Sequence, residues 1–261
     1  MLMDTQLELV KKQFSQNAAA YVTSATHNDA NVPAELVQLL NPQPTEEALD
    51  IATGPGTVGL ALAPHVQKVV VFDATPAMLE QATRRAKEAG YDHFEAVEGM
   101  AEELPFPDDS FDIVTVRTAP HHYSDIQRAV NEMSRVVKPT GRVMIVDTSS
   151  PEDMTVATEM NDLERLRDAS HVWNYMPSQW HEMLAKSGLK VTYERNATHA
   201  MGKRLWFNDW TDRMKVTPEA KADLWKRFTE GSAALRELLE VSVQGDDLSF
   251  TLPEITLIAT R

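Results

Sequence analysis

Between residues 48 and 147, five short apolar segments alternate with stretches of helical pattern, and this alternation constrains the fold more than any other feature. The segments are ALDIA (48–52), VVVFD (69–73), FEAVEG (94–99), FDIVTVR (111–117) and RVMIVD (142–147). Strands that are buried on both faces read as near-continuous apolar runs, and strands separated by helices pair in parallel. The sequence therefore predicts an α/β fold with a Rossmann-like, mostly parallel sheet and helices on both faces.

Capping residues and helix breakers mark the helices of this region. We expect helices at 57–64, 76–89 and 125–138. Thr75 suits the N-cap position of the second helix, with Pro76 in its first turn. Ser124 and Gln127 have the spacing of a capping box before the third helix, whose apolar residues recur at helical spacing.

Helices are also predicted on both sides of this region. The patterns indicate helices at 7–20 and 31–40, a polar helix at 152–168, a helix at 178–187, a strand at 189–196, two or three helices within 207–239 and a terminal strand at 248–261. All five tryptophans lie in the second half of the chain: Trp173, Trp180, Trp206, Trp210 and Trp225. We interpret them as core and interdomain packing. An aromatic lid over an apolar substrate is the alternative.

Composition excludes several classes of function. A net charge of −14 repels the phosphates of nucleic acid, so a nucleic-acid partner is not expected. The chain has no cysteine, which excludes disulfides, thiolate metal sites and cysteine nucleophiles. No apolar run approaches the roughly 20 residues of a transmembrane helix, and residues 1–14 lack the pattern of a secretory signal. We therefore expect a cytoplasmic protein that acts on a small molecule, neutral or apolar. A homodimer is one of the states that the sequence allows.

A glycine-rich turn follows the first predicted strand, in the segment LDIATGPGTVG (49–59). Gly54, Gly56 and Gly59 match the GxGxxG spacing of dinucleotide-binding proteins, but that spacing alone does not identify the ligand. Asp50 is more informative, because a carboxylate near the end of an apolar strand is costly unless it faces a hydrogen-bonding or cationic group. A pyrophosphate would be repelled there, whereas the cationic amino-acid end of S-adenosyl-L-methionine would be favoured.

A second acidic residue, Asp73, ends the second predicted strand. A carboxylate at this position accepts hydrogen bonds from ribose hydroxyls in nucleotide-binding Rossmann folds. The alternative is a solvated loop aspartate. The separation of Asp73 from the glycine turn favours the ribose contact.

Four segments, in this order, resemble the successive motifs of class I methyltransferases: ALDIATGPGTVGLALA (48–63), VVVFDATPAMLEQA (69–82), VEGMAEELPFPDDSFDIVTVRTAPHHYSD (97–125) and VVKPTGRVMIVD (136–147). The resemblance is strongest to the branch that includes the ubiquinone/menaquinone-biosynthesis C-methyltransferases, and the whole chain resembles an uncharacterised bacterial subgroup of it. It implies an S-adenosyl-L-methionine-dependent enzyme, with S-adenosyl-L-homocysteine as its product. It also implies a seven-stranded sheet that closes with an antiparallel hairpin.

The resemblance assigns roles to single residues. Gly54 and Gly56 would lie against the amino-acid part and ribose of the cofactor, and Asp73 would bind the ribose. Met78 would pack on the adenine, although helical spacing also suits a core residue. The other implied cofactor contacts are Tyr21 in an N-terminal lid, Asp50, Ala52, Ala74, Met100, the backbone of Ala101, and Arg117. Met100 stands where family members often carry an aspartate, which weakens the expected adenine contact by about 1 kcal/mol unless Glu102 or a water molecule replaces the missing acceptor.

Two histidines are the candidates for a general base. His121 and His122 follow the fourth predicted strand, where the carboxyl edge of a parallel sheet faces its ligand crevice. An imidazole titrates near neutrality and can take a proton from a hydroxyl, amine or acidic carbon. Either histidine could instead shape the pocket. Tyr123 and Arg117 are weaker candidates, and no metal site is expected.

Three functions follow as alternatives. The first is methyl transfer to a carbon, oxygen or nitrogen atom of a small molecule, with residues 1–45 as a helical lid, 46–150 as the cofactor-binding half and 151–261 as a C-terminal half with substrate-side helices. The second is an NAD-dependent oxidoreductase that uses the GxGxxG turn. The third is a protein that binds the cofactor without turnover.

Overall fold

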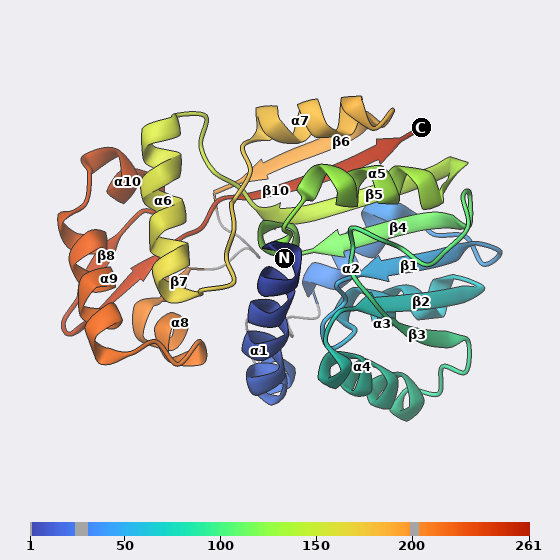
Figure 1. The fold of residues 1–261 in the computed structure, drawn as a ribbon, viewed down its shortest axis with the longest axis horizontal. Coiled ribbons are helices and arrows are strands. Elements are labelled where there is room, and N and C mark those ends of the chain that lie inside the picture. Colours follow the sequence, from blue (N-terminus) through green and yellow to red (C-terminus); the bar gives the residue numbers. More distant parts are fainter. Residues whose placement is uncertain (1, 24–30, 199–203) are drawn as a thin grey trace.

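A seven-stranded sheet forms the centre of the computed structural model, which describes residues 2–23, 31–198 and 204–261 (Figure 1). Its strands lie in the order β3 (Phe94–Glu98), β2 (Lys68–Asp73), β1 (Glu47–Ile51), β4 (Phe111–Arg117), β5 (Val137–Thr148), β10 (Glu254–Thr260) and β6 (Lys190–Ala197). Strand β10 runs antiparallel to both of its neighbours, while the pairs from β3 to β5 are parallel. This arrangement confirms the predicted Rossmann-like sheet and its antiparallel end.

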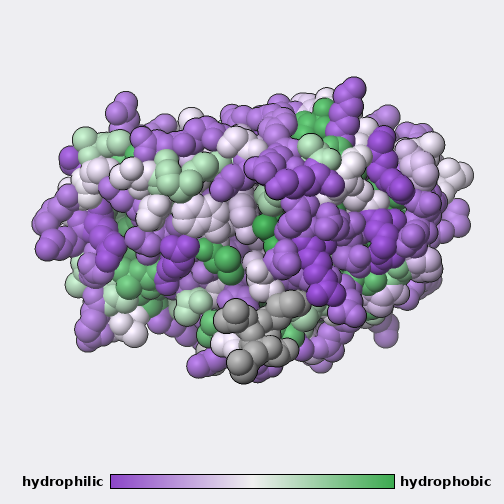
Figure 2. Space-filling view, turned by 45° about the horizontal axis from the view of Figure 1, so that its top comes forward, coloured by the Kyte–Doolittle hydropathy of each residue, from purple (hydrophilic) through white to green (hydrophobic). Residues whose placement is uncertain are grey.

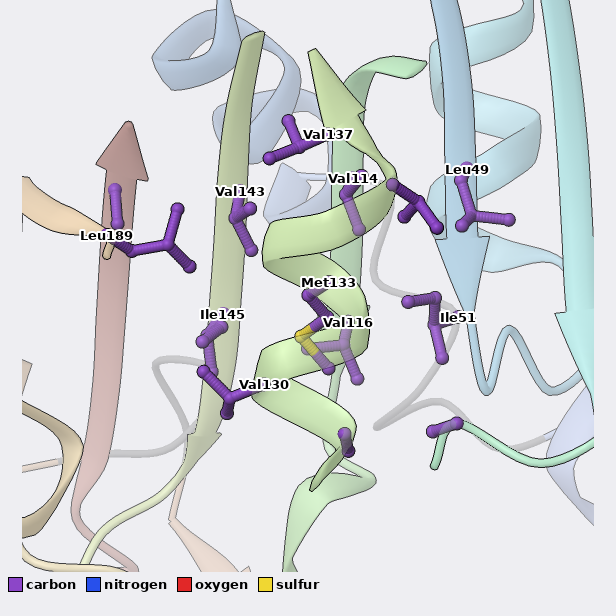
Figure 3. Packing of buried hydrophobic residues seen from close by; sticks show 14 of the residues in the cluster. Leu49, Ile51, Val114, Val116, Val130, Met133, Val137, Val143, Ile145 and Leu189 are labelled. Carbon is purple, nitrogen blue, oxygen red and sulfur yellow. The ribbon is translucent and has the colours of Figure 1, made fainter. Parts of the chain in front are cut away.

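Helices cover both faces of the sheet, because its strands carry apolar side chains on both sides. Helices α2 (Asn31–Leu40), α3 (Thr57–Leu62) and α4 (Pro76–Glu88) contribute to the core on one face. Helices α5 (Ile126–Val136) and α7 (Pro177–Lys186) contribute to the core on the other. Figure 3 shows Val130 and Met133 of α5 beside Val116 of β4 and Ile145 of β5.

A second group of elements lies between β5 and β10 in the sequence and packs around its own core. It contains helices α6 (Met154–Arg167), α8 (Phe207–Arg213), α9 (Pro218–Glu230) and α10 (Ala233–Leu238), with a small sheet of β7 (Leu205–Trp206), β9 (Asp247–Phe250) and β8 (Ser242–Gln244). The predicted single strand at 248–261 is therefore wrong: it divides into β9 and β10, which belong to different sheets. Pro253 lies in the break, where its missing N–H cannot join a ladder.

Helix α1 (Leu2–Thr23) lies between the large sheet and this second group (Figure 1). The Nε2 atom of Gln6 donates to the carbonyl oxygens of His122 (3.0 Å) and Ser170 (2.6 Å). On the other side, Lys11 forms an ion pair with Glu98, the last residue of β3. Helix α1 therefore joins both parts of the molecule across the carboxyl edge of the sheet.

Hydrophilic side chains dominate the face of the molecule shown in Figure 2. Exposed large hydrophobic side chains of the described residues, such as Met154 and Val243, belong to separate elements. None of the helices in the described part of the chain is long and apolar enough to cross a membrane.

Two local predictions need correction or refinement. Asp125, not Ser124, is the N-cap of α5, since its side chain accepts from the backbone N–H of Arg128. Ser124 instead donates its hydroxyl to Glu102 at 2.9 Å. Helix α6 begins with Asp153 as its N-cap and is not polar all round, because one of its faces is buried in the second core.

Core packing accounts for most of the tryptophans. Trp180 is fully buried in the core under α7, and Trp210 and Trp225 pack with the aromatic rings of the second core. The ring of Trp173 lies under the guanidinium of Arg165, while Trp206 is exposed. Only Trp210 among them also lines the cavity described below, so an aromatic lid is not what these residues form.

Candidate functional site

A cavity of about 210 Å³ lies at the carboxyl ends of β1, β2 and β4. One side is lined by the glycine turn and the loops after β2 and β3, and the other by side chains of α1, α6 and α8 and the segment before β10. The residues brought together include most of those predicted from sequence: Asp50, Ala52, Gly54, Asp73, Ala74, Met78, Met100, Ala101, Arg117, His121 and His122. Open α/β folds bind their ligands at the carboxyl ends of their parallel strands.

Asp50 is held by donors of the chain itself. Its Oδ2 accepts from the hydroxyl of Thr53 (2.5 Å) and the backbone N–H of Gly59 (2.9 Å), and its Oδ1 accepts from the hydroxyl of Thr115 (2.9 Å). Burial raises the pKa of Asp50 to about 6, against the lowering effect of these donors. A ligand is therefore not needed to explain why this carboxylate is tolerated. Asp50 fixes the turn after β1 and still borders the cavity.

The two leading glycines of the turn have different neighbours. Gly54 has φ +54°, donates its N–H to Oδ2 of Asp73 (2.9 Å), and has open space where a side chain would project. Gly56 has φ +82°, and a Cβ there would meet the Cβ of Ala82 in α4 at 2.9 Å. Gly54 therefore faces the cavity, whereas Gly56 allows α3 and α4 to approach and is not among the lining residues.

Asp73 links the glycine turn after β1 to the loop after β2. Besides the bond from Gly54, its Oδ1 accepts from the backbone N–H of Thr75 at 2.8 Å. Burial raises the pKa of Asp73, and these hydrogen bonds oppose the rise. Thr75 is the N-cap of α4 by position, as predicted, but its side chain makes no capping bond.

Apolar side chains of α4 and of the loop after β3 form one wall of the cavity. Met78 of α4 is buried and borders the cavity, so it belongs both to the core and to the site. Met100 and Ala101 follow β3 and line the same wall. Glu102 accepts from the N–H and the hydroxyl of Ser124, just before the N-cap of α5, so one of its oxygens already has partners.

His121 forms a pair with Asp147. Its Nδ1 lies 2.6 Å from Oδ1 of Asp147, and its backbone N–H donates to Oδ2 at 3.0 Å. Burial lowers the pKa of His121, but the charge and hydrogen bond of Asp147 outweigh burial, so the net pKa is raised. Asp147 is the carboxylate at the carboxyl end of β5, and sequence reasoning assigned it no role.

His122 and His171 surround this pair but have other partners. Nδ1 of His122 lies 3.0 Å from the carbonyl oxygen of Ser170, and burial lowers the pKa of His122 to about 4. Nε2 of His171 lies 2.8 Å from Oδ1 of Asn161, and burial likewise lowers its pKa. The three rings lie close together, with His121 and His122 centroids 4.2 Å apart. Of the two histidines predicted from sequence, His121 alone makes a hydrogen bond with a carboxylate of the described residues.

Charged side chains from distant elements complete the site. Arg117 ends β4, and Glu164 and Arg167 come from α6. Arg213 ends α8, and Glu254 begins β10. Except for Arg117, sequence reasoning missed them, because no local motif marks residues that only the packing of α6 and α8 brings to the sheet. Tyr21 lies in α1, but its side chain is outside the described residues.

In the described part of the chain, no cluster of three or more histidine, aspartate, glutamate or cysteine side chains could hold a metal ion. Gly54 leaves open space at the turn, and Asp73 borders the same space with a carboxylate. These residues fit an adenosyl ligand whose ribose lies against Asp73. Strand β10, inserted antiparallel between β5 and β6, departs from the order 3-2-1-4-5-6 of dinucleotide-binding domains. Together the sheet and the site define a Rossmann-like methyltransferase that uses S-adenosyl-L-methionine.

Comparison with known proteins agrees with this class. Residues 25–199 match the model of the ubiE/COQ5 methyltransferase family, and the chain belongs to this family. YcgJ, an uncharacterized methyltransferase of Bacillus subtilis (strain 168), is 32% identical over 246 residues, which are 94% of this chain and 96% of YcgJ. The demethylmenaquinone methyltransferase of Bacillus velezensis is 38% identical over 119 residues, which are 44% of this chain and 51% of that protein.

Solved structures show the same fold. The crystal structure of BH2331, a candidate methyltransferase of Bacillus halodurans C-125, superposes with a TM-score of 0.83 at 35% identity, over 88% of this chain and 98% of that one. The crystal structure of YcgJ gives a TM-score of 0.81 over 88% of this chain and 99% of YcgJ. The protein transfers a methyl group from S-adenosyl-L-methionine to a small-molecule acceptor, and nothing in these comparisons favours an NAD-dependent oxidoreductase.

Proposed function

We propose that His121 is the general base of this methyl transfer and that Asp147 positions it. The observation that carries the proposal is the 2.6 Å contact between Nδ1 of His121 and Asp147 at the edge of the cavity. The carboxylate orients the ring and favours a proton on Nδ1, which leaves Nε2 to accept a proton from the acceptor. Among the described residues, no hydrogen bond reaches Nε2.

The cofactor, when bound, would supply a methyl group on a positively charged sulfur, and the nucleophile would attack the methyl carbon in line with the carbon–sulfur bond. The chain contributes alignment and exclusion of water, since side chains of α1 cover the cavity. His121 takes the proton that the acceptor atom loses as its bond to the methyl carbon forms. An oxygen, nitrogen or acidic carbon acceptor fits this step, and the relationship to demethylmenaquinone methyltransferases supports a carbon acceptor.

We propose that the cofactor lies along the lining formed by Ala52, Gly54, Asp73, Ala74, Met78, Met100 and Ala101, with Asp50 behind the turn. The support is that all of these residues border one cavity. Gly56 does not share this support. Of residues 1–45, α1 would act as a lid, whereas α2 packs in the core of the sheet; residues 46–150 would form the cofactor-binding half and 151–261 the substrate side. Gln6 and Phe14 of α1, which line the same cavity, support the lid.

The substrate side of the cavity supports two kinds of acceptor. Its apolar side chains support the neutral or apolar acceptor expected from the sequence, while the three arginines and several carboxylates that border it support a polar or charged group on that acceptor. We also propose a cytoplasmic location, which the lack of cysteine, and therefore of disulfides, supports.

The test is transfer of labelled methyl groups to a metabolite extract. Wild type and His121→Gln would be incubated with methyl-labelled S-adenosyl-L-methionine, and binding of S-adenosyl-L-homocysteine would be measured by calorimetry. We expect His121→Gln to bind the product within about threefold of wild type and to transfer at least 100 times more slowly, within the range of general-base catalysis. His122→Gln is the matched control and should retain most of the transfer.

Two results would contradict the proposal in different ways. Equal rates for His121→Gln and wild type would show that the base is wrong. Binding of S-adenosyl-L-homocysteine with no labelled product from wild type and any extract would favour a protein without turnover.

A further inference from the structure

Arg117 is a partly buried cation that has no hydrogen-bond or ion-pair partner among the described residues. Its guanidinium lines the cavity at the carboxyl end of β4. Within the described residues it forms no hydrogen bond or ion pair, and its Nε is inaccessible to solvent. Arg142, on the neighbouring strand β5, behaves differently: it donates to Leu40 and Asn41 carbonyl oxygens and to both carboxylate oxygens of Glu46.

The cost of this arrangement points to a ligand. A guanidinium carries five N–H donors and cannot lose its charge in a protein. Burial lowers the pKa of Arg117, so the site disfavours the cation even though Glu254 and Asp50 attract it. Asp50 already accepts from Thr53, Thr115 and Gly59. An unpaired buried charge destabilises the free protein, and such residues are retained at binding sites.

We propose that Arg117 binds a carboxylate or phosphate group of a ligand held in this cavity. The planar fork of arginine matches both groups with two parallel hydrogen bonds. The inference rests on the proposed function for its ligands. Two sources supply this chemistry: the amino-acid carboxylate of the cofactor, and an anionic group on the acceptor.

Arg117 lies between the cofactor side and the substrate side of the cavity, so either anionic group can be its partner. In the sheet, Val116 pairs with Ile51 of β1, just before the glycine turn on the cofactor side. Arg117 itself pairs with Val146 of β5, next to Asp147, and the charge of Glu254 influences it from the substrate side. The residue therefore stands at the junction between the two halves of the site.

The first arm of the test measures nucleoside binding to Arg117→Met by calorimetry. S-adenosyl-L-homocysteine carries the carboxylate, and 5′-methylthioadenosine lacks it. If the anion is that of the cofactor, the variant should bind S-adenosyl-L-homocysteine at least tenfold more weakly and bind 5′-methylthioadenosine as wild type does. Arg128→Met, on the exposed side of α5, is the control and should bind both normally.

The second arm uses the labelled metabolite extract and separates products on an anion exchanger at pH 8. If the anion belongs to the acceptor, both nucleosides bind normally, the wild-type product is retained by the exchanger, and Arg117→Met lowers its yield at least tenfold. If wild type gives no product while nucleosides bind, the proposed function fails, and the first arm alone decides the partner of Arg117.

Thermal unfolding without ligands separates a binding role from a structural one. Replacing an unpaired buried charge by methionine should leave the melting temperature unchanged or raise it, whereas Arg142→Met should lower it by about 4 °C or more. The proposal is overturned if Arg117→Met is as destabilised as Arg142→Met. Normal binding of S-adenosyl-L-homocysteine by Arg117→Met overturns the proposal when it is combined with one of three results for the methylated product. These are a neutral product, formation of the product by Arg117→Met at the wild-type yield, and no product from wild type.

Discussion

His121 contacts the carboxylate of Asp147 twice, once through its imidazole ring and once through its backbone N–H. Nδ1 lies 2.6 Å from Oδ1, and the backbone N–H donates to Oδ2 at 3.0 Å. The carbonyl oxygen of His121 in turn accepts from the N–H groups of Val172 and Trp173. The peptide of His121 is thus held on both sides, and its ring has little freedom to turn away from Asp147.

Removing the charge of Asp147 should change the pH dependence of turnover. The pKa of His121 is raised above its usual value of 6.5, because Asp147 outweighs the lowering effect of burial. The neutral ring is the active form, so kcat/KM should rise with pH through a value above 6.5. In Asp147→Asn the pKa falls, so the acid limb should move to lower pH while kcat drops about 100-fold. A pH–rate profile of both enzymes measures this shift.

His122→Gln serves as the control for that profile. The pKa of His122 is about 4, so this ring stays neutral across the range where the enzyme would be assayed. The variant should keep the acid limb of wild type. If the acid limb moved in His122→Gln and stayed in Asp147→Asn, the base would be His122 and the proposal for His121 would be wrong.

Loss of the Asp73 carboxylate should weaken cofactor binding. Its oxygens accept from Gly54 and Thr75 and border the space assigned to the ribose. Hydrogen bonds to a charged group contribute about 1.5–3 kcal/mol, so Asp73→Ala should bind S-adenosyl-L-homocysteine roughly 10- to 100-fold more weakly. A 2′,3′-dideoxy analogue lacks the hydroxyls and should lose much less affinity in the variant. Normal binding of S-adenosyl-L-homocysteine by Asp73→Ala would show that the ribose lies elsewhere.

The parallel half of the fold could be predicted because most of its strands carry a continuous apolar run; β3 (FEAVE) does not, and its place follows from the alternation of strands with helices. The second group of elements could not be predicted in the same detail. Residues 248–261 form one apolar run, yet Phe250 packs in the second core and Ile255 in the first. Which core a strand joins depends on contacts that are distant in sequence. The start of α5 was misplaced by one residue, since Ser124 and Asp125 both suit an N-cap and only the position of Glu102 separates them.

The cofactor side of the site followed from local motifs, whereas the substrate side did not. Gly54 and Asp73 lie close to one another in sequence and each follows its own strand, so their meeting is a property of the parallel sheet. Asp147 lies 26 residues from His121, and no spacing rule connects them. Asp50 shows a different limit: its burial was predicted, but its donors Thr53 and Thr115 were not, and they supply much of what a ligand had been expected to supply.

The two glycines of the turn should respond differently to alanine. Gly56→Ala forces a Cβ to within 2.9 Å of Ala82 at φ +82°, so we expect a loss of about 2–4 kcal/mol of unfolding free energy. Gly54→Ala has open space and only backbone strain, so it should lose about 1 kcal/mol but weaken binding of S-adenosyl-L-homocysteine. Denaturant unfolding and calorimetry on both variants measure the contrast. Equal destabilisation by the two substitutions would contradict it.

Asp50 should make the stability of the free protein depend on pH. Its pKa is raised from 3.8 to about 6, because burial disfavours the charge. The folded state then holds this proton more tightly than the unfolded state, so the contribution is present at low pH and is lost as pH rises from about 4 to 6. The loss amounts to about 3 kcal/mol. The difference in unfolding free energy between wild type and Asp50→Asn should follow this curve, and a difference that is constant over this range would contradict the shift.

A cationic cofactor should reverse part of this effect. Positive charge beside Asp50 favours its ionised form, so binding of S-adenosyl-L-methionine near pH 6 should release a fraction of a proton. Calorimetry in buffers of different ionisation enthalpy measures that release. Two comparisons should abolish it: 5′-methylthioadenosine, which carries neither the sulfonium nor the ammonium, and the Asp50→Asn variant. Release of the same size in Asp50→Asn would assign the proton to another group and place the cationic end of the cofactor away from the turn after β1.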